Sequence, residues 1–396
     1  MFTNSISHSL KDKEGHFMFT YSAPSVTGKP LPAKSFIFVF DCSTSMEGTK
    51  IEQCRQLYGR SAKLFRDIDE VAVVSYSDHA NVLCDWTKCD MEGKAKLKKA
   101  FNDLMPNGCT NLSGGLFQAL SMTSDRPDAT IIMCTDGIAN RGVTNVSNFK
   151  SLVNKFVGDT NTRIFTLGIG DDHQSQMLVE CSVNGMYSYA RTDEETTSAF
   201  ANIMGASFST VFQNVEFAVS SENVYLTDID DKPVDTIRVG DLMAEETKNM
   251  LLKIKCSGNL PSVIHCKLSG TNILNGEYEE HGETYIFDRT DKEPSELLTK
   301  RLKILEGVKE LKKIRKLKQE GRHKEAETSF SSLHPDVMTA LNVPMPCVTR
   351  ATSMPALDSV IQSHQLERDT SSGYNRNSNY TTPYRSMVTR MVAEQQ

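Results

Sequence analysis

Residues 35–45 read SFIFVFDCSTS, an apolar run that ends in one carboxylate and two hydroxyl side chains at alternate positions. An uninterrupted apolar run of this length is typical of a strand that is buried on both faces of a sheet. We therefore expect a strand over 36–40, with Asp41, Ser43 and Ser45 at the edge of the sheet where it ends. Oxygen ligands, with no histidine or thiolate among them, suit a hard divalent cation such as Mg²⁺.

Two further segments carry oxygen ligands for the same cation. Residues 107–111 (NGCTN) form a glycine-containing loop with the hydroxyl of Thr110, just before a predicted helix. Residues 129–133 form a second apolar strand, and Asp136 follows it. Ligands of open α/β sheets bind beyond the carboxyl ends of the strands, and we expect all three loops to lie at such ends. The predicted metal site consists of Asp41, Ser43, Ser45, Thr110 and Asp136.

This pattern, Asp-x-Ser-x-Ser followed by Thr and then Asp, resembles the metal-ion-dependent adhesion site of von Willebrand factor type A domains. The resemblance covers residues 34–209. It implies that Ser43, Ser45 and Thr110 bind the cation through their hydroxyls, with Asp41 and Asp136 behind them, bonding directly or through water. Mg²⁺, or alternatively Mn²⁺ or Ca²⁺, is the implied ion. The resemblance also implies that an Asp or Glu of a partner protein fills the open position.

Three more residues are candidates for the rim of this site. Glu47 extends the first loop, where it either approaches a partner or faces solvent. Asn111 is a candidate for orienting Thr110. Asp78 follows the second predicted strand on the same edge of the sheet, although a solvated turn is the favoured interpretation of 77–79. Because two carboxylates balance the charge of Mg²⁺, an incoming acidic side chain is not repelled.

The pattern of alternating strands and helices over residues 32–209 predicts a doubly wound, mostly parallel, six-stranded α/β sheet of Rossmann-like type, flanked by helices. The second and third strands are close enough to form a hairpin, which gives one antiparallel edge. The expected strands are 36–40, 71–76, 80–84, 130–134, 163–168 and 186–189, and the expected helices are 48–65, 94–104, 112–122, 145–156 and 194–208.

The rest of the chain predicts other architectures. Residues 210–290 hold short alternating runs without helical spacing, which indicates an antiparallel β-sandwich. Residues 1–31 hold one alternating run, 15–21, that we expect to join this sandwich. Leucines at helical spacing and a break at Gly321 predict a helical hairpin over 291–343. Residues 344–396 are polar with little apolar periodicity, which predicts a largely disordered tail.

Composition narrows the class of protein further. A net charge of −6 argues against nucleic-acid binding, and no apolar run approaches the roughly 20 residues that span a bilayer. The polar start of the chain is unlike a secretory signal. The ten cysteines follow no zinc-binding spacing. We expect them to be reduced, mostly small buried side chains, in a cytoplasmic protein.

These features lead to one main functional hypothesis and two alternatives. We expect a protein–protein docking module that depends on a divalent cation and is not an enzyme. A metal-dependent hydrolase is an alternative, but no general base accompanies the motif. A scaffold, or a substrate-recognition component of a ubiquitin-ligase-like assembly, is the other alternative. Ligase activity itself is disfavoured, because the sequence has no Cys/His zinc pattern.

Overall fold

The computed structural model describes residues 3–26, 31–157, 162–170, 173–228, 231–257, 261–287 and 290–333, together with Asp358 and Ile361. The chain divides into two compact units. The α/β unit is built on Pro32–Ser209, and the β unit on Met1–Leu31 and Thr210–Thr352. No helix among the described residues is both long and apolar enough to cross a membrane.

The α/β unit holds a six-stranded sheet of order β5-β4-β3-β6-β7-β8. All neighbours pair in parallel except β4 and β5, so the predicted antiparallel edge is confirmed. The strands are β3 (Ser35–Asp41), β4 (Glu70–Tyr76), β5 (Ala80–Lys88), β6 (Thr130–Thr135), β7 (Arg163–Ile169) and β8 (Tyr187–Ala190). The helices are η1 (Thr44–Met46), α1 (Thr49–Ser61), α2 (Met91–Asn102), α3 (Leu112–Ser121), α4 (Val146–Val157), α5 (Ser175–Cys181) and α6 (Asp193–Ser209).

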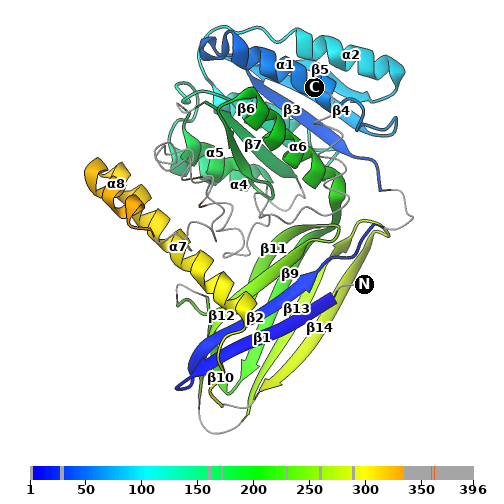
Figure 1. The fold of residues 1–396 in the computed structure, drawn as a ribbon. Coiled ribbons are helices and arrows are strands. Elements are labelled where there is room, and N and C mark those ends of the chain that lie inside the picture. The colour runs from blue at the N-terminus through cyan, green and yellow to red at the C-terminus, as the bar shows by residue number, and fades with distance from the viewer. Residues whose placement is uncertain are drawn as a thin grey trace. The chain divides into compact units, whose positions relative to one another are not determined.

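Helices cover both faces of this sheet (Figure 1). Successive side chains of a strand point to opposite faces, and β3 places Phe36, Phe38 and Phe40 in a core with α1, α2 and α6. Ile37 and Val39 belong instead to the core on the other face, with α3, α4 and α5. The strand is therefore apolar at every position because both of its faces are buried. The predicted doubly wound α/β fold is confirmed.

The β unit consists of two four-stranded antiparallel sheets, of order β1-β2-β12-β10 and β11-β9-β13-β14. Side chains of both sheets share one apolar core, in which Phe19 of β2 stacks on Phe217 of β9 with ring centroids 5.2 Å apart. The strands are β1 (Thr3–Lys11), β2 (Glu14–Ser22), β9 (Thr210–Glu222), β10 (Val224–Thr227), β11 (Thr236–Met243), β12 (Thr247–Cys256), β13 (Ser262–Asn272) and β14 (Glu277–Phe287).

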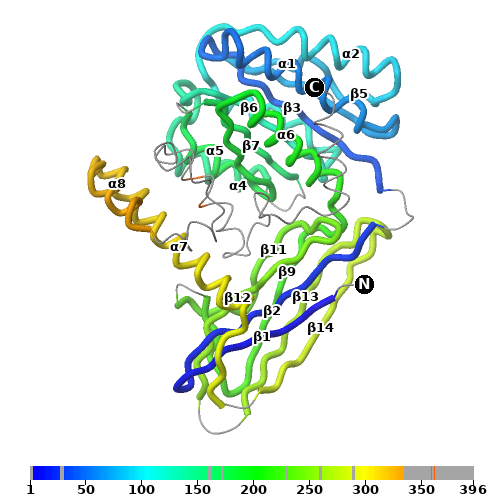
Figure 2. The backbone as a smooth tube through the Cα atoms, viewed as in Figure 1, coloured from blue at the N-terminus to red at the C-terminus, as the bar shows by residue number. Residues whose placement is uncertain are grey.

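The start of the chain lies within this second unit. Figure 2 shows the N-terminal strand β2 beside β12, more than 200 residues later in the chain, and the two pair antiparallel from Glu14↔Lys255 to Ser22↔Thr247. The prediction that a strand near 15–21 joins the later β-strands is therefore confirmed. The first strand, β1, was not predicted, and it forms a hairpin with β2.

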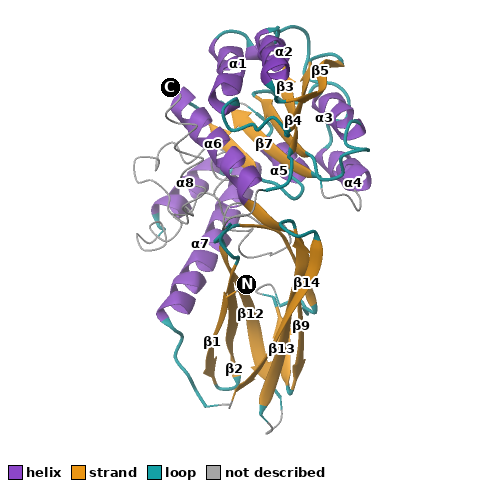
Figure 3. Ribbon diagram, turned by 90° about the vertical axis from the view of Figure 1, so that its right-hand side faces the viewer, coloured by secondary structure: helices purple, strands orange, loops and turns teal. Residues whose placement is uncertain are grey.

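Two C-terminal helices, α7 (Glu296–Gln319) and α8 (His323–Ser331), follow the strands (Figure 3). The side chain of Ser295 caps α7 by accepting a hydrogen bond from the backbone N–H of Leu298. Leu298 and Leu305 pack with Met18 and Leu251, so α7 covers the outer face of the β2–β12 pair. The helices of the predicted hairpin are present.

The predicted disordered tail, 344–396, lies outside the described residues except at two positions. Asp358 and Ile361 are both helical and both buried. The Asp358 carboxylate accepts a hydrogen bond of 2.6 Å from the hydroxyl of Ser175, the first residue of α5.

Candidate metal centre

Two of the three predicted loops leave the sheet from neighbouring strands. β3 and β6 pair in parallel, with Phe40 opposite Cys134. Asp41 is the last residue of β3, and Asp136 follows the last residue of β6. The register therefore brings the two carboxylates to the same edge of the sheet, as predicted from the sequence.

Asp41 is the most deeply buried of the predicted ligands, with 0% of its surface exposed. Its Oδ1 accepts a 2.8 Å hydrogen bond from the backbone N–H of Ser43, and its Oδ2 accepts a 2.5 Å bond from the hydroxyl of Thr135. Burial raises the pKa of Asp41, and the carboxylate of Asp136 raises it further, whereas the hydrogen bonds from Thr135 and Ser43 oppose the rise. The buried carboxylate is thus fixed in orientation by two donors.

A chain of hydroxyl groups connects Ser43 to the second carboxylate. The Oγ atoms of Ser43 and Ser45 lie 3.0 Å apart, and the Ser45 hydroxyl donates a 3.0 Å hydrogen bond to Oδ1 of Asp136. Ser43 and Asp136 are buried, whereas Ser45 is exposed. The oxygens therefore extend from the interior to the surface, where a ligand from solution can reach them.

Thr110 belongs to a loop that connects two helices and is held at the ends of the strands. The 107–111 loop follows the helix α2 and not the carboxyl end of a strand. Backbone hydrogen bonds hold it against the strand ends, from Asn107 N–H to the Cys42 carbonyl at 2.7 Å and from Asn111 N–H to the Ser77 carbonyl at 2.9 Å. The 107–111 loop therefore lies at the carboxyl ends of β3 and β4, as expected, although no strand leads directly into it. The loop is instead anchored laterally on the loops after β3 and β4.

Gly137 shows how closely Thr110 approaches the carboxylates. A Cβ atom on this glycine would lie 3.1 Å from the Thr110 hydroxyl oxygen and 3.4 Å from Oδ2 of Asp41. A side chain at position 137 would therefore press on the Thr110 hydroxyl and come into contact with the Asp41 carboxylate. Asn140 fixes Thr110 on its other side, because its Oδ1 accepts from the Thr110 N–H at 2.9 Å and its own N–H donates to the Thr110 carbonyl at 3.1 Å.

The three rim residues have different environments. Glu47 is exposed. Asn111 caps α3, with Oδ1 accepting from the Gly114 N–H at 3.0 Å, and so does not hold the Thr110 backbone as Asn140 does. Asp78 forms an ion pair of 3.0 Å with Arg141 and thereby connects the β4–β5 turn to the loop after β6. That pairing goes beyond the solvated turn expected from the sequence.

Three residues at this site were not identified from the sequence. Thr135 bonds to Asp41, Asn140 holds Thr110, and the ammonium group of Lys50 pairs with Oδ2 of Asp136. The hydroxyl of Thr135, adjacent to Asp136 at a strand end, was a usable signal. No sequence pattern identifies Lys50 or Asn140, because their contacts depend on how the loops fold back on the sheet.

The donor set fits a hard divalent cation. It consists of two carboxylates and three hydroxyls, the oxygen ligands that Mg²⁺ and Ca²⁺ take in proteins. The Lys50 ammonium shows that a positive charge is already favoured at Asp136. Among the described residues, no three or more His, Cys, Asp or Glu side chains are grouped so that they could hold a metal ion, so a cation here would depend on the hydroxyls as well as the two carboxylates.

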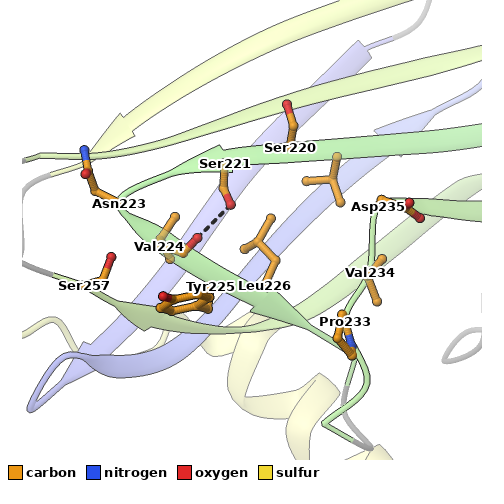
Figure 4. A pocket seen from close by; sticks show the side chains of 11 residues that line it. Ser220, Ser221, Asn223, Val224, Tyr225, Leu226, Pro233, Val234, Asp235 and Ser257 are labelled. Carbon is orange, nitrogen blue, oxygen red and sulfur yellow. Dashed lines mark hydrogen bonds between the residues drawn. The ribbon is translucent and has the colours of Figure 1, made fainter.

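A pocket of about 490 Å³ lies elsewhere, in the β unit (Figure 4). Its lining comes from the end of β9, from β10 and from the segment that precedes β11. Within this lining, the Ser221 hydroxyl donates a hydrogen bond to the Val224 carbonyl. Of its lining residues, only Asp235 and Tyr225 carry titratable groups. It thus lacks the gathered carboxylates and hydroxyls found at the ends of β3 and β6.

The described cysteines are free thiols, and most are buried. Burial raises the pKa of Cys42 and of Cys266 to about 12, and that of Cys181 still higher. Such thiols are protonated and unreactive at neutral pH. They act as small apolar side chains, as expected.

Solved structures share this fold across both units. A von Willebrand factor type A protein from Catenulispora acidiphila matches with a TM-score of 0.69 and 15% identity, over 94% of this chain and 97% of its own. The ArnB paralog VWA2 from Sulfolobus acidocaldarius matches with a TM-score of 0.58 and 12% identity, over 94% of this chain and all of its own. At these identities the likeness extends to the fold alone.

Sequence relatives match about half of the chain. Inter-alpha-trypsin inhibitor heavy chain H2 of Mus musculus is 25% identical over 218 residues, which are 51% of this chain and 22% of that protein. Heavy chain H6 of Homo sapiens is 27% identical over 199 residues, 46% of this chain and 15% of that protein. The chain thus spans less than a quarter of the length of these relatives. The von Willebrand factor type A domain family matches residues 36–203, and this part of the chain is a von Willebrand factor type A domain.

Proposed function

We propose that this protein is a docking module in which a divalent cation, held at the carboxyl ends of β3 and β6, joins it to an acidic group of a partner protein. One observation carries the proposal. Two buried carboxylates and three hydroxyls come together from three segments of the chain: Ser43, Ser45 and Asp136 form a chain of close oxygens, and Gly137 lies against both Thr110 and Asp41. Domains of this family commonly mediate protein–protein contacts and metal-dependent adhesion, which supports the same conclusion.

The residues divide into two roles. Ser43, Ser45 and Thr110 present hydroxyl oxygens as ligands, and Asp41 and Asp136 supply the negative charge behind them. A bound Mg²⁺ or Mn²⁺ provides an open coordination position for a carboxylate of the partner. Thr135 and Asn140 keep Asp41 and Thr110 in place, so that little rearrangement accompanies binding.

The proposal assigns no reaction to this site. Asp41 is tied to Thr135 and the Ser43 backbone, and Asp136 is tied to Ser45 and Lys50. Both carboxylates thus already have fixed partners, and we assign neither the role of a general base. We propose a non-enzymatic protein, for which phosphate esters and peptides should show no turnover with Mn²⁺ present. The free thiols support the cytoplasm as its proposed compartment, and cell fractionation tests this.

Partner capture from native extract tests the docking function. Wild type, Asp41→Ala and the double variant Ser43→Ala/Ser45→Ala are compared in Mg²⁺ and in EDTA, with Asp125→Ala as control because Asp125 is an exposed carboxylate after α3. The fluorescence of Trp86, the single tryptophan of the chain, confirms that each variant is folded. The proposal requires partners that wild type and control bind only with Mg²⁺ and that the site variants lose. Equal capture by all four proteins, or capture unaffected by EDTA, would contradict it.

A further inference from the structure

Lys50, the second residue of α1, is a cation already in contact with the predicted site. Its ammonium group pairs with Oδ2 of Asp136 and lies 3.4 Å from the backbone carbonyl of Ser45. The Asp136 carboxylate is fully buried, whereas the Lys50 side chain is 35% exposed. The lysine thus reaches from the surface to a buried acid, and its exposed stem leaves it a route back to solvent.

The two carboxylates of the site are neutralised unequally. The contacts of Asp41 are hydroxyl and backbone N–H donors, whereas Asp136 receives both the Ser45 hydroxyl and the Lys50 ammonium. Two buried like charges at one edge of a sheet repel each other, and a neighbouring cation reduces that cost. Lys50 changes the formal charge of the site residues from minus two to minus one.

The geometry points to Lys50 as a resident counter-cation of this site: it neutralises Asp136 before a divalent cation binds, weakens the binding of that cation, and strengthens the subsequent attraction of an acidic partner group. The inference rests on the proposed function. With Lys50 in place, the site bearing a divalent cation has a net formal charge of plus one. Without Lys50, the site with its divalent cation bound has no net formal charge, because the two carboxylates balance the cation. A carboxylate from a partner is then not attracted by an excess positive charge.

The two effects of removing Lys50 therefore have opposite signs. The divalent cation loses a competing positive charge, so its affinity rises. The partner's carboxylate loses an attractive charge, so its affinity for the loaded site falls. A lysine that only fastened the start of α1 to the sheet would lower both affinities together when it was removed, because the site would lose its shape.

The test is a titration of the full chain with Mn²⁺, followed by the electron paramagnetic resonance of the free ion. We expect Lys50→Gln to bind Mn²⁺ roughly tenfold more tightly than wild type, which corresponds to about 1.4 kcal/mol. Lys50→Arg keeps the charge and should stay within about threefold of wild type. Lys155→Gln removes an exposed lysine in the last turn of α4 and should change nothing.

Each outcome distinguishes the inference from the proposed function. Unchanged or weaker Mn²⁺ binding by Lys50→Gln, with normal binding by wild type, overturns the inference alone. If neither protein binds Mn²⁺, both the metal site and the inference fail. Because the glutamine variant is expected to be less stable without metal, its thermal midpoint is measured in EDTA and in Mn²⁺. The inference requires Mn²⁺ to raise that midpoint by more than in wild type, and an equal or smaller rise counts against it.

A second measurement tests the predicted loss of carboxylate attraction. Acetate serves as the probe, and bound Mn²⁺ broadens its proton resonance when acetate enters the loaded site. At equal Mn²⁺ occupancy, we expect less broadening with Lys50→Gln than with wild type or Lys50→Arg. Equal broadening in all three proteins would remove the proposed role of Lys50 toward an acidic partner.

Discussion

Replacing Thr135 by valine removes one hydroxyl from the interior of the site with almost no change in shape. Thr135 is fully buried at the end of β6, and its hydroxyl donates to Asp41 Oδ2 at 2.5 Å. Hydrogen bonds to charged groups contribute about 1.5–3 kcal/mol, against about 1 kcal/mol for neutral pairs. We therefore expect Thr135→Val to lower the free energy of unfolding by about 2 kcal/mol at neutral pH.

Urea denaturation in EDTA, followed by the fluorescence of Trp86, measures this effect. Trp86 lies in β5 and bonds through its indole N–H to the Met122 carbonyl, so it reports on the α/β unit. Thr123→Val is the matched control, because the Thr123 hydroxyl is also buried but donates to a neutral acceptor, the Leu120 carbonyl at 2.8 Å. Its expected cost is about 1 kcal/mol.

The two variants should also differ in metal binding. Thr135→Val frees one oxygen of Asp41 from its fixed orientation, so Mn²⁺ should bind more weakly, whereas Thr123→Val should bind as wild type does. The reasoning is refuted if Thr135→Val costs no more stability than Thr123→Val. That result would mean that Thr135 does not hold an ionised Asp41.

Four other predictions concern the metal site, the packing of α7 and a buried thiol. Because burial raises the pKa of Asp41, protonation should weaken Mn²⁺ binding at pH values above the ordinary aspartate pKa of about 3.9, as titrations from pH 7 to 5 would show. Asn140→Ala, which releases the Thr110 N–H, should weaken Mn²⁺ binding several-fold and cost about 1 kcal/mol in urea denaturation. Leu298→Ala should destabilise the packing of α7 by about 2–5 kcal/mol, seen as faster amide exchange in that helix. Cys42, with a pKa of about 12, should react with a thiol reagent at pH 8 only after unfolding.

The α/β fold was predictable because its strands are buried on both faces. β3 is apolar from Phe36 to Phe40 since alternate side chains enter two different cores. Such a continuous apolar run predicts a buried strand, and the segments between these strands have apolar residues at helical spacing. The antiparallel edge was also predictable, because only three residues separate β4 from β5.

The elements that were missed lack such patterns. β1 begins with exposed polar residues, and only three consecutive residues, 8–10, are buried. β1 forms a strand because its backbone pairs with β2, and its own residues show no pattern that would predict a strand. The helix α5 has seven residues, too few for apolar spacing to stand out, and it is held by packing of Met177 and Leu178 into the core.

The site was predictable as far as its ligands follow the strands in sequence. Asp41 and Asp136 could be placed because parallel strands end at a common edge. The supports could not, because Asn140 and Lys50 act through loops and a helix start whose course the sequence does not reveal. The 107–111 loop shows the same limit, since it reaches the site from α2 by hydrogen bonds to neighbouring loops.

Mn²⁺ stoichiometry is the most direct test of the metal site. The wild-type chain should bind one Mn²⁺, and Ser43→Ala/Ser45→Ala should bind none while its Trp86 fluorescence stays native. The control Ser147→Ala/Ser151→Ala removes two exposed serines of α4 and should bind one ion. Equal binding by the wild type and the site variant, or no binding by the wild type, would contradict the assignment of these hydroxyls and carboxylates to a metal.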